Sequence, residues 1–80
     1  MIYTLCIDGE TWMKDIKVNP EQKIKETIQI LIDGNVLPKI SANADITLFS
    51  ERKGEFIDME KSYNETQIFQ GDILQISYEQ

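Results

Sequence analysis

The sequence predicts an α+β domain in which one helix packs on a mixed sheet of four or five strands. Apolar residues recur with helical spacing in a single segment, residues 19–34, whereas the other apolar segments alternate with the period of strands. The chain has 80 residues, which is enough for one hydrophobic core but too short for two. We therefore expect residues 1–80 to form a single domain, in which the helix covers one face of the sheet.

The first two predicted strands form a hairpin. Residues 1–7 alternate between two faces and are rich in β-forming residues, and the Asp8-Gly9 pair that follows is typical of a tight turn. A second, antiparallel strand is expected from Thr11 to Val18. Tyr3, Leu5 and Ile7 share one side of the first strand, and in the second strand the side chains expected to face the helix are Trp12, Ile16 and Val18. Lys14 interrupts this inward pattern, which indicates a sheet edge or a bulge.

The helix carries both a start signal and a stop signal. Asn19 is a suitable N-cap, Pro20 suits the first helical position, and Gln22 is placed to complete a capping box. At the other end, Gly34 is expected to adopt the left-handed conformation that terminates many helices. The expected apolar stripe consists of Ile24, Ile28, Leu31 and Ile32. Ile30 lies off this stripe, where it is either covered by the following loop, which we favour, or partly exposed.

The rest of the chain is expected to return as short strands and turns. The expected elements are an irregular segment over residues 35–45, strands over residues 46–50, 55–58 and 73–78, and turns over residues 51–54 and 59–67. Phe56 is the expected anchor of the second of these strands, and Tyr63 is the large apolar residue of the second turn region. The Gly71-Asp72 turn leads into the last strand. Inward anchors of the irregular segment are expected at Val36, Leu37, Pro38 and Ile40.

The first and last strands are the longest apolar ones, which makes them natural neighbours at the centre of the sheet. A hairpin cannot join them, because the rest of the chain lies between. We therefore expect them to pair in parallel, with the helix in the crossover connection. A hairpin, a helix, short strands and a final strand around such a central pair make a β-grasp arrangement.

These residues resemble the ubiquitin-like superfamily over nearly the whole chain. The entry to the helix at Val18-Asn19-Pro20, the Leu48-Phe49 strand and the segment from Tyr63 to Ile76 look like corresponding landmarks. The closing segment from Gln70 to Ile76 is most similar to the YukD/EsaB family, small bacterial ubiquitin-like proteins associated with type VII secretion systems. The resemblance implies a ubiquitin-like β-grasp fold with core positions at Tyr63, Ile68, Leu74 and Ile76.

One departure from ubiquitin bears on function. Ubiquitin and the related sulfur carriers end in Gly-Gly, because their terminal carboxylate must be adenylated in a narrow active site. The sequence here ends Ser77-Tyr78-Glu79-Gln80. We therefore expect a module that is not conjugated to other proteins, in agreement with what the YukD/EsaB resemblance implies.

Charge and hydropathy argue against several partners. The formal net charge of −6 disfavours nucleic acid and anionic lipid. No segment approaches the roughly 18 consecutive apolar residues that cross a bilayer, so we expect a cytoplasmic protein with no direct membrane insertion. The single Cys6 excludes an internal disulfide and suits a small buried side chain in a reducing compartment.

We do not expect an enzyme. The sequence has no His, so neither a Ser–His nor a Cys–His nucleophile pair can form. One Cys without His leaves no ligand set for zinc or an iron–sulfur cluster, and the four glycines are too dispersed for a phosphate-binding loop. We therefore assign no catalytic residue, no metal site and no cofactor.

The class of function that remains is the recognition of other proteins. The candidate binding residues are Phe49, Met13 and Ile73, whose strand parity turns them away from the helix. Phe49 stands at or next to the position of the isoleucine at the centre of the recognition patch of ubiquitin. The alternative is that these three side chains are ordinary exposed apolar surface.

The expected function is that of a cytosolic, non-covalent adaptor or regulator. The resemblance implies an accessory component of a bacterial type VII secretion system, with a protein partner in the cytosolic part of the apparatus. The alternative is a β-grasp carrier or a small regulatory subunit of a metabolic enzyme complex. In either case we expect a monomer or a weak dimer.

Overall fold

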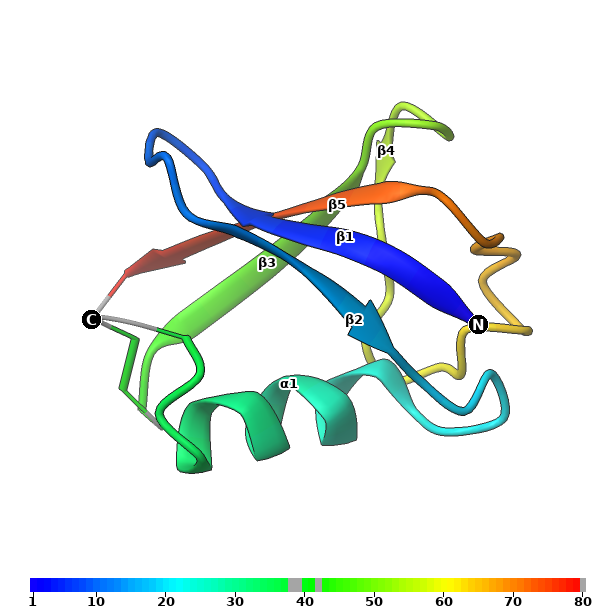
Figure 1. Ribbon diagram of the computed structural model, residues 1–80. Helices are drawn as coiled ribbons and strands as arrows, with labels where there is room; N and C mark the ends of the chain where they lie inside the picture. Colours follow the sequence, from blue (N-terminus) through cyan, green and yellow to red (C-terminus); the bar gives the residue numbers. More distant parts are fainter. Residues whose placement is uncertain (38–39, 42, 80) are drawn as a thin grey trace.

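The computed structural model describes residues 1–37, 40–41 and 43–79 of the chain. Its elements are β1 (Ile2–Ile7), β2 (Met13–Lys17), α1 (Ile24–Asp33), β3 (Asp45–Ser50), β4 (Glu55–Phe56) and β5 (Ile73–Glu79). The strands form one sheet in the order β2-β1-β5-β3-β4, and α1 lies across one face of it (Figure 1). The prediction of an α+β, β-grasp arrangement is confirmed.

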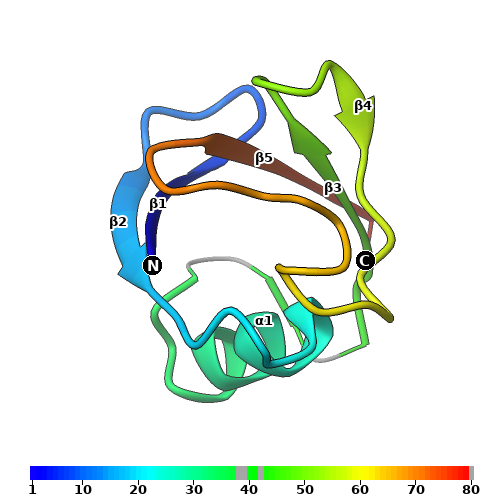
Figure 2. The same cartoon turned by 90° about the vertical axis from the view of Figure 1, so that its right-hand side faces the viewer.

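The centre of the sheet is the parallel pair of β1 and β5, as predicted. Leu5 lies opposite Leu74 and Ile7 lies opposite Ile76. β1 pairs antiparallel with β2, and β3 pairs antiparallel with both β5 and β4. Figure 2 shows the sheet curving over α1, with the chain between β4 and β5 passing in front of the space between them.

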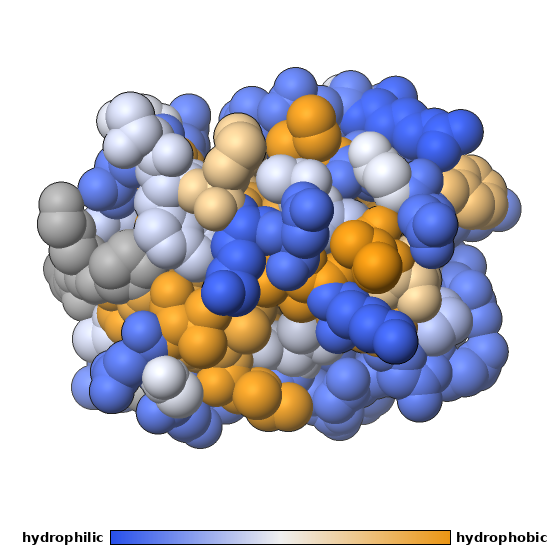
Figure 3. Space-filling model, viewed as in Figure 1, coloured by the Kyte–Doolittle hydropathy of each residue, from blue (hydrophilic) through white to orange (hydrophobic). Residues whose placement is uncertain are grey.

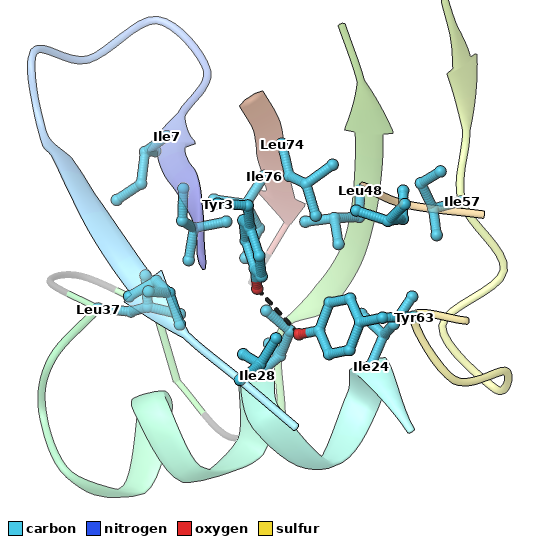
Figure 4. Packing of buried hydrophobic residues seen from close by; sticks show 14 of the residues in the cluster. Tyr3, Ile7, Ile24, Ile28, Leu37, Leu48, Ile57, Tyr63, Leu74 and Ile76 are labelled. Atoms are coloured by element: carbon cyan, nitrogen blue, oxygen red, sulfur yellow. Dashed lines mark hydrogen bonds between the residues drawn. The ribbon is translucent and has the colours of Figure 1, made fainter. Parts of the chain in front are cut away.

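The core lies between α1 and the inner face of the sheet (Figure 4). The strands contribute alternate residues and α1 contributes one stripe, because these are the periods at which side chains share a face. The buried apolar residues are Tyr3, Leu5, Ile7, Ile16, Val18, Ile24, Ile28, Ile32, Leu37, Ile40, Leu48, Ile57, Tyr63, Ile68, Leu74 and Ile76. On α1, Leu31 is only half-buried and Thr27 is buried instead. Pro38, an expected anchor, lies outside the described residues.

Two tyrosine hydroxyls meet inside this core. Tyr3 and Tyr63 share a hydrogen bond of 2.9 Å, and their ring centroids are 5.4 Å apart. A turn holds Tyr63 in place, since the Glu65 carboxylate accepts from the Ser62 backbone N–H and the Ser62 hydroxyl accepts from the Glu65 N–H. Burial raises the pKa of both tyrosines above the ordinary value, so both hydroxyls stay protonated.

The helix begins later than the sequence signals predict. The backbone and side-chain oxygens of Asn19 accept hydrogen bonds from Gln22 and Glu21, but they close a separate turn before α1. The first residue of α1 is Ile24, and its N–H donates to the carbonyl of Lys61 at 3.0 Å. The unpaired N–H groups at the start of a helix need acceptors. Here Lys61 and Met59 of a distant loop accept from the N–H groups of Ile24 and Lys25, so the prediction of Asn19 as the N-cap was wrong.

The helix also ends differently from the prediction. Gly34 has a φ of −84°, which any residue adopts, and the left-handed residue is Asn35 with a φ of 57°. The N–H of Val36 donates to the carbonyl of Leu31 at 2.9 Å, and the N–H of Asn35 donates to that of Ile32 at 3.0 Å. These two bonds define a Schellman motif with Asn35 at its left-handed position. Asn tolerates this conformation better than most residues other than glycine.

Two large apolar side chains lie differently from their predicted positions. Ile30 is 60% exposed and is not covered by the loop after α1. Phe56 is 70% exposed, whereas the next residue, Ile57, is buried and donates its N–H to the carbonyl of Leu48. Neighbouring residues of an extended chain point to opposite faces, so only one of the two can enter the core. The anchor of this segment is Ile57.

Among the described residues, no helix is long and apolar enough to cross a membrane.

Candidate protein-binding surface

The outer face of the sheet, which points away from α1, carries a row of side chains that crosses all five strands. Residues that pair directly across neighbouring strands point to the same face, so the register identifies the row. From β2 to β4 it consists of Met13, Cys6, Gln75, Phe49 and Phe56, and we call these five residues the outer row.

All three residues predicted to bind a partner lie on this outer face. Met13 is 64% exposed at one end of the outer row, and Phe49 is half-buried near the other end. Ile73, 36% exposed, pairs with Thr4 in the next row along the strands. The structure thus places the three on one surface, with Met13 and Phe49 separated by the two central strands.

Phe56 also belongs to this surface, although it was predicted to be the anchor of its strand and not a binding residue. Its ring packs edge-on against Phe49, with centroids 5.2 Å apart and an interplanar angle of 77°. This is a favourable geometry for two aromatic rings. The adjacent Ile57 was the available signal, because two consecutive apolar residues in a strand face opposite sides.

A buried carboxylate connects the aromatic end of the outer row, formed by Phe49 and Phe56, to the centre of the sheet through hydrogen bonds. Asp72, 2% exposed, accepts hydrogen bonds from the Ser50 hydroxyl at 2.6 Å and from the backbone N–H groups of Arg52 and Ile73. The Ser50 hydroxyl also accepts from the N–H of Lys53 at 3.1 Å. A carboxylate is tolerated inside a protein when hydrogen bonds replace its hydration. The turn between β3 and β4, and with it Phe56, is therefore held to the start of β5.

The cysteine at the centre of this face is not an activated nucleophile. Cys6 was predicted to be buried, but it lies on the outer face and is half-buried. Its Sγ lies 3.7 Å from the carbonyl of Leu74. Burial, and after it the negative charges of Glu51 and Asp8, raises the pKa of the Cys6 thiol, which disfavours the reactive thiolate. Cys6 thus contributes apolar surface to the outer row.

A second apolar surface competes with the outer face as a binding site. The side of the molecule that shows β2 and α1 has apolar patches between charged residues (Figure 3). On α1, the exposed Ile30 is the large apolar side chain available to a partner. A separate hollow of about 190 Å³ is lined by Lys25, Ile28, Gln29, Ile32, Ala44, Ile46 and Met59. Any test of the outer face therefore needs a control on α1.

Among the described residues, no three His, Cys, Asp or Glu side chains are grouped so that they could hold a metal ion. Comparison of the chain with protein-family models finds no matching family, and a search of the curated proteins finds no similar sequence.

Proposed function

We propose that this protein is an interaction module that binds another protein non-covalently through the outer face of its sheet. The observation that carries the proposal is the exposure of Met13 and Phe56 at the two ends of the outer row, on the face opposite the core. Aromatic residues and methionine are enriched in protein–protein interfaces, where a few buried anchors supply most of the affinity. Phe49 and Phe56 together form such an anchor, because their rings already pack on each other.

The cellular role we propose is that of a cytosolic accessory or regulatory component of a bacterial type VII secretion system. The support for it is the resemblance of residues 70–76 to the YukD/EsaB family, together with the β-grasp order of elements. The partner is then a cytosolic part of the secretion apparatus.

The experiment is affinity capture of partners from the native cell, at normal abundance, with gentle cross-linking. Three forms are compared, the unaltered protein, Phe56→Asp and Ile30→Asp. Both substitutions place a charge on a largely exposed side chain, one on the outer face and the other on α1, so both variants should stay folded. The proposal predicts that secretion components are captured by the unaltered protein and by Ile30→Asp but not by Phe56→Asp.

Two other results would change the assignment. Recovery of a metabolic enzyme complex, lost in Phe56→Asp, would retain the binding surface but replace the secretion role by that of a regulatory subunit. Loss of the partner in Ile30→Asp with retention in Phe56→Asp would reject the outer face and point to α1. Thermal unfolding of each variant shows whether a loss of capture reflects the surface or the fold.

A further inference from the structure

The outer face is acidic as well as partly apolar. Register and hydrogen bonds place four carboxylates on or beside it, those of Asp15, Asp45, Glu51 and Glu79. Against these, the described strands carry one lysine with outward parity, Lys17 opposite Ile2. The net charge of the face therefore has the same sign as the net charge of −6 of the whole chain.

These carboxylates flank the outer row on both sides. Asp15 pairs with Thr4 and Glu51 follows β3, so both lie two residues along the strands from the row, or about 7 Å. The Glu51 carboxylate reaches the row itself, because it accepts a hydrogen bond of 2.9 Å from the Gln75 amide. On the other side, Asp45 and Glu79 lie four residues away, or about 13 Å.

Asp45 and Glu79 are directly opposite each other in the β3–β5 ladder. Like charges in this position disfavour the sheet. They border a shallow hollow of about 320 Å³ that is also lined by Thr47, Ser77 and Tyr78. Among the described residues, no Lys or Arg side chain lies within ion-pair distance of either carboxylate. A cationic group placed over this pair would relieve the repulsion between the two carboxylates.

The two basic residues of the turn between β3 and β4 are engaged elsewhere. The Arg52 guanidinium lies over the ring of Phe69, 5.1 Å from its centroid. The Lys53 ammonium pairs with Glu55 at 3.1 Å and donates to the carbonyl of Thr66. Neither is positioned to neutralise the outer face.

From these observations we propose that the outer face binds a basic amphipathic segment of another protein, with apolar side chains on the outer row and Lys or Arg beside the flanking carboxylates. This inference rests on the proposed function of that face. A second copy of this chain or an anionic surface is disfavoured, because each would bring negative charge against negative charge. A purely apolar partner is disfavoured too, because it would cover carboxylates without replacing their hydration.

The dimensions suit a short helix. The outer row crosses four gaps between strands, which is about 19 Å and matches roughly 13 residues of helix. The probe is accordingly a labelled peptide of roughly fourteen residues, patterned with leucine on one helical face and lysine on the other. Two matched peptides carry serine in place of leucine or glutamate in place of lysine, and fluorescence anisotropy measures the binding of all three.

Two variants of the protein remove the same amount of charge from different places. In Asp45→Asn/Glu79→Gln the two carboxylates leave the outer face, and in Glu26→Gln/Asp33→Asn they leave α1. We expect the leucine–lysine peptide to bind, the first variant to weaken binding about fivefold and the second to leave it unchanged. We also expect Phe56→Ser to weaken binding about tenfold, and added salt to weaken it in the unaltered protein.

Several results would overturn the inference. They are no binding of the leucine–lysine peptide, equal binding of the serine or glutamate peptide, and equal weakening by the two charge variants. Sedimentation that shows a dimer disrupted by Phe56→Asp would also overturn it, because the occupant would then be a second copy.

Failure of this inference can be separated from failure of the proposed function. A partner captured from the cell and lost in Phe56→Asp, but retained undiminished by Asp45→Asn/Glu79→Gln, would keep the outer face as the binding surface and reject a basic partner. A partner retained by Phe56→Asp would reject the proposed surface itself.

Discussion

The carboxylate of Asp72 joins three parts of the structure through its hydrogen bonds. It is buried, yet it satisfies donors from three places: the end of β3, the turn after it and the start of β5. Removing a buried acceptor leaves its donors without partners, and each such donor costs free energy. The motif that looked like a simple Gly-Asp turn in the sequence is therefore a connection between two parts of the sheet.

We predict that Asp72→Ala lowers the free energy of unfolding by about 2–4 kcal/mol, because it leaves buried donors unpaired. The control is Asp58→Ala, since Asp58 is exposed and accepts one hydrogen bond, from the N–H of Glu60. It should cost less than about 1 kcal/mol. Denaturant unfolding of the two variants decides the matter, and equal costs would show that the Asp72 network contributes no special stability.

A second prediction concerns the titration of the paired tyrosines, Tyr3 and Tyr63. The folded-state pKa of Tyr3 and Tyr63 is raised by burial, whereas in the unfolded chain both return to the ordinary value near 10. Above that pH the unfolded chain loses two protons that the folded chain keeps. The contribution of this pair to the free energy of unfolding is therefore complete below about pH 10 and declines above it, with a limiting slope of about 2.7 kcal/mol per pH unit for two groups.

The measurement is the free energy of unfolding at pH 9 and at pH 10.5 to 11, for the unaltered protein and for Tyr3→Phe/Tyr63→Phe. The double variant removes both phenols and should lose most of the alkaline decline. An equally steep decline in the double variant would assign the effect to other groups. Because both partners are removed together, the variant leaves no buried hydroxyl unpaired between them.

At the scale of elements, both ends of α1 are fixed by features outside the local start and stop signals. Carbonyls of the loop at Met59 and Lys61 accept from the first helical N–H groups, and Lys25 pairs with Glu60 of the same loop at 2.6 Å. At the other end Asn35, and not Gly34, takes the left-handed conformation. The helix is thus set in place by the segment between β4 and β5 as much as by its own sequence.

We predict that Asn35→Ala lowers the free energy of unfolding by about 1 kcal/mol, because alanine resists the left-handed conformation. Asn35→Gly should be neutral or stabilising, because glycine adopts a positive φ without steric cost. Thermal unfolding of both variants tests the assignment. If alanine is tolerated as well as glycine, the helix does not depend on a left-handed residue at this position.

Substitutions of the adjacent residues Phe56 and Ile57 test which of the two side chains lies in the core. Ile57→Ala should cost about 2–4 kcal/mol, because it opens a cavity in the core. Phe56→Ala should cost less, because its ring is mostly exposed and loses chiefly its contact with Phe49. Denaturant unfolding gives both values. The reverse order would restore Phe56 to the core and remove it from the binding surface.

The alternating strands explain why so much of the fold is predictable from the sequence. Tyr3, Leu5 and Ile7 repeat with a period of two, and this pattern with the Asp8-Gly9 turn is enough to define the hairpin. The start of the helix was less predictable, because the acceptors of its first N–H groups lie more than thirty residues away in the sequence. Its end was misassigned by one residue, because Asn35, next to Gly34, takes the left-handed conformation. Phe56 was misassigned for a similar reason, since the choice between it and Ile57 depends on how β4 pairs with β3.

Across the whole molecule, the two faces of the sheet differ in burial and in the kinds of side chain they carry. The inner face supports stability through its contact with α1, and the outer face combines exposed apolar side chains with carboxylates. The candidate binding residues Phe49, Met13 and Ile73 were found from strand parity. The strand order β2-β1-β5-β3-β4 was needed to see that Met13 and Phe49 belong to one row and that carboxylates flank this row.

Methyl NMR gives a direct test of whether partners bind this outer face. With the methionine and isoleucine methyl groups labelled, the purified partner is added and each methyl signal is followed. We expect shifts or broadening at Met13 and Ile73 on the outer face, with Ile30 on α1 unaffected. Changes at Ile30 with none at Met13 and Ile73 would contradict it and place the partner on the helix side of the molecule.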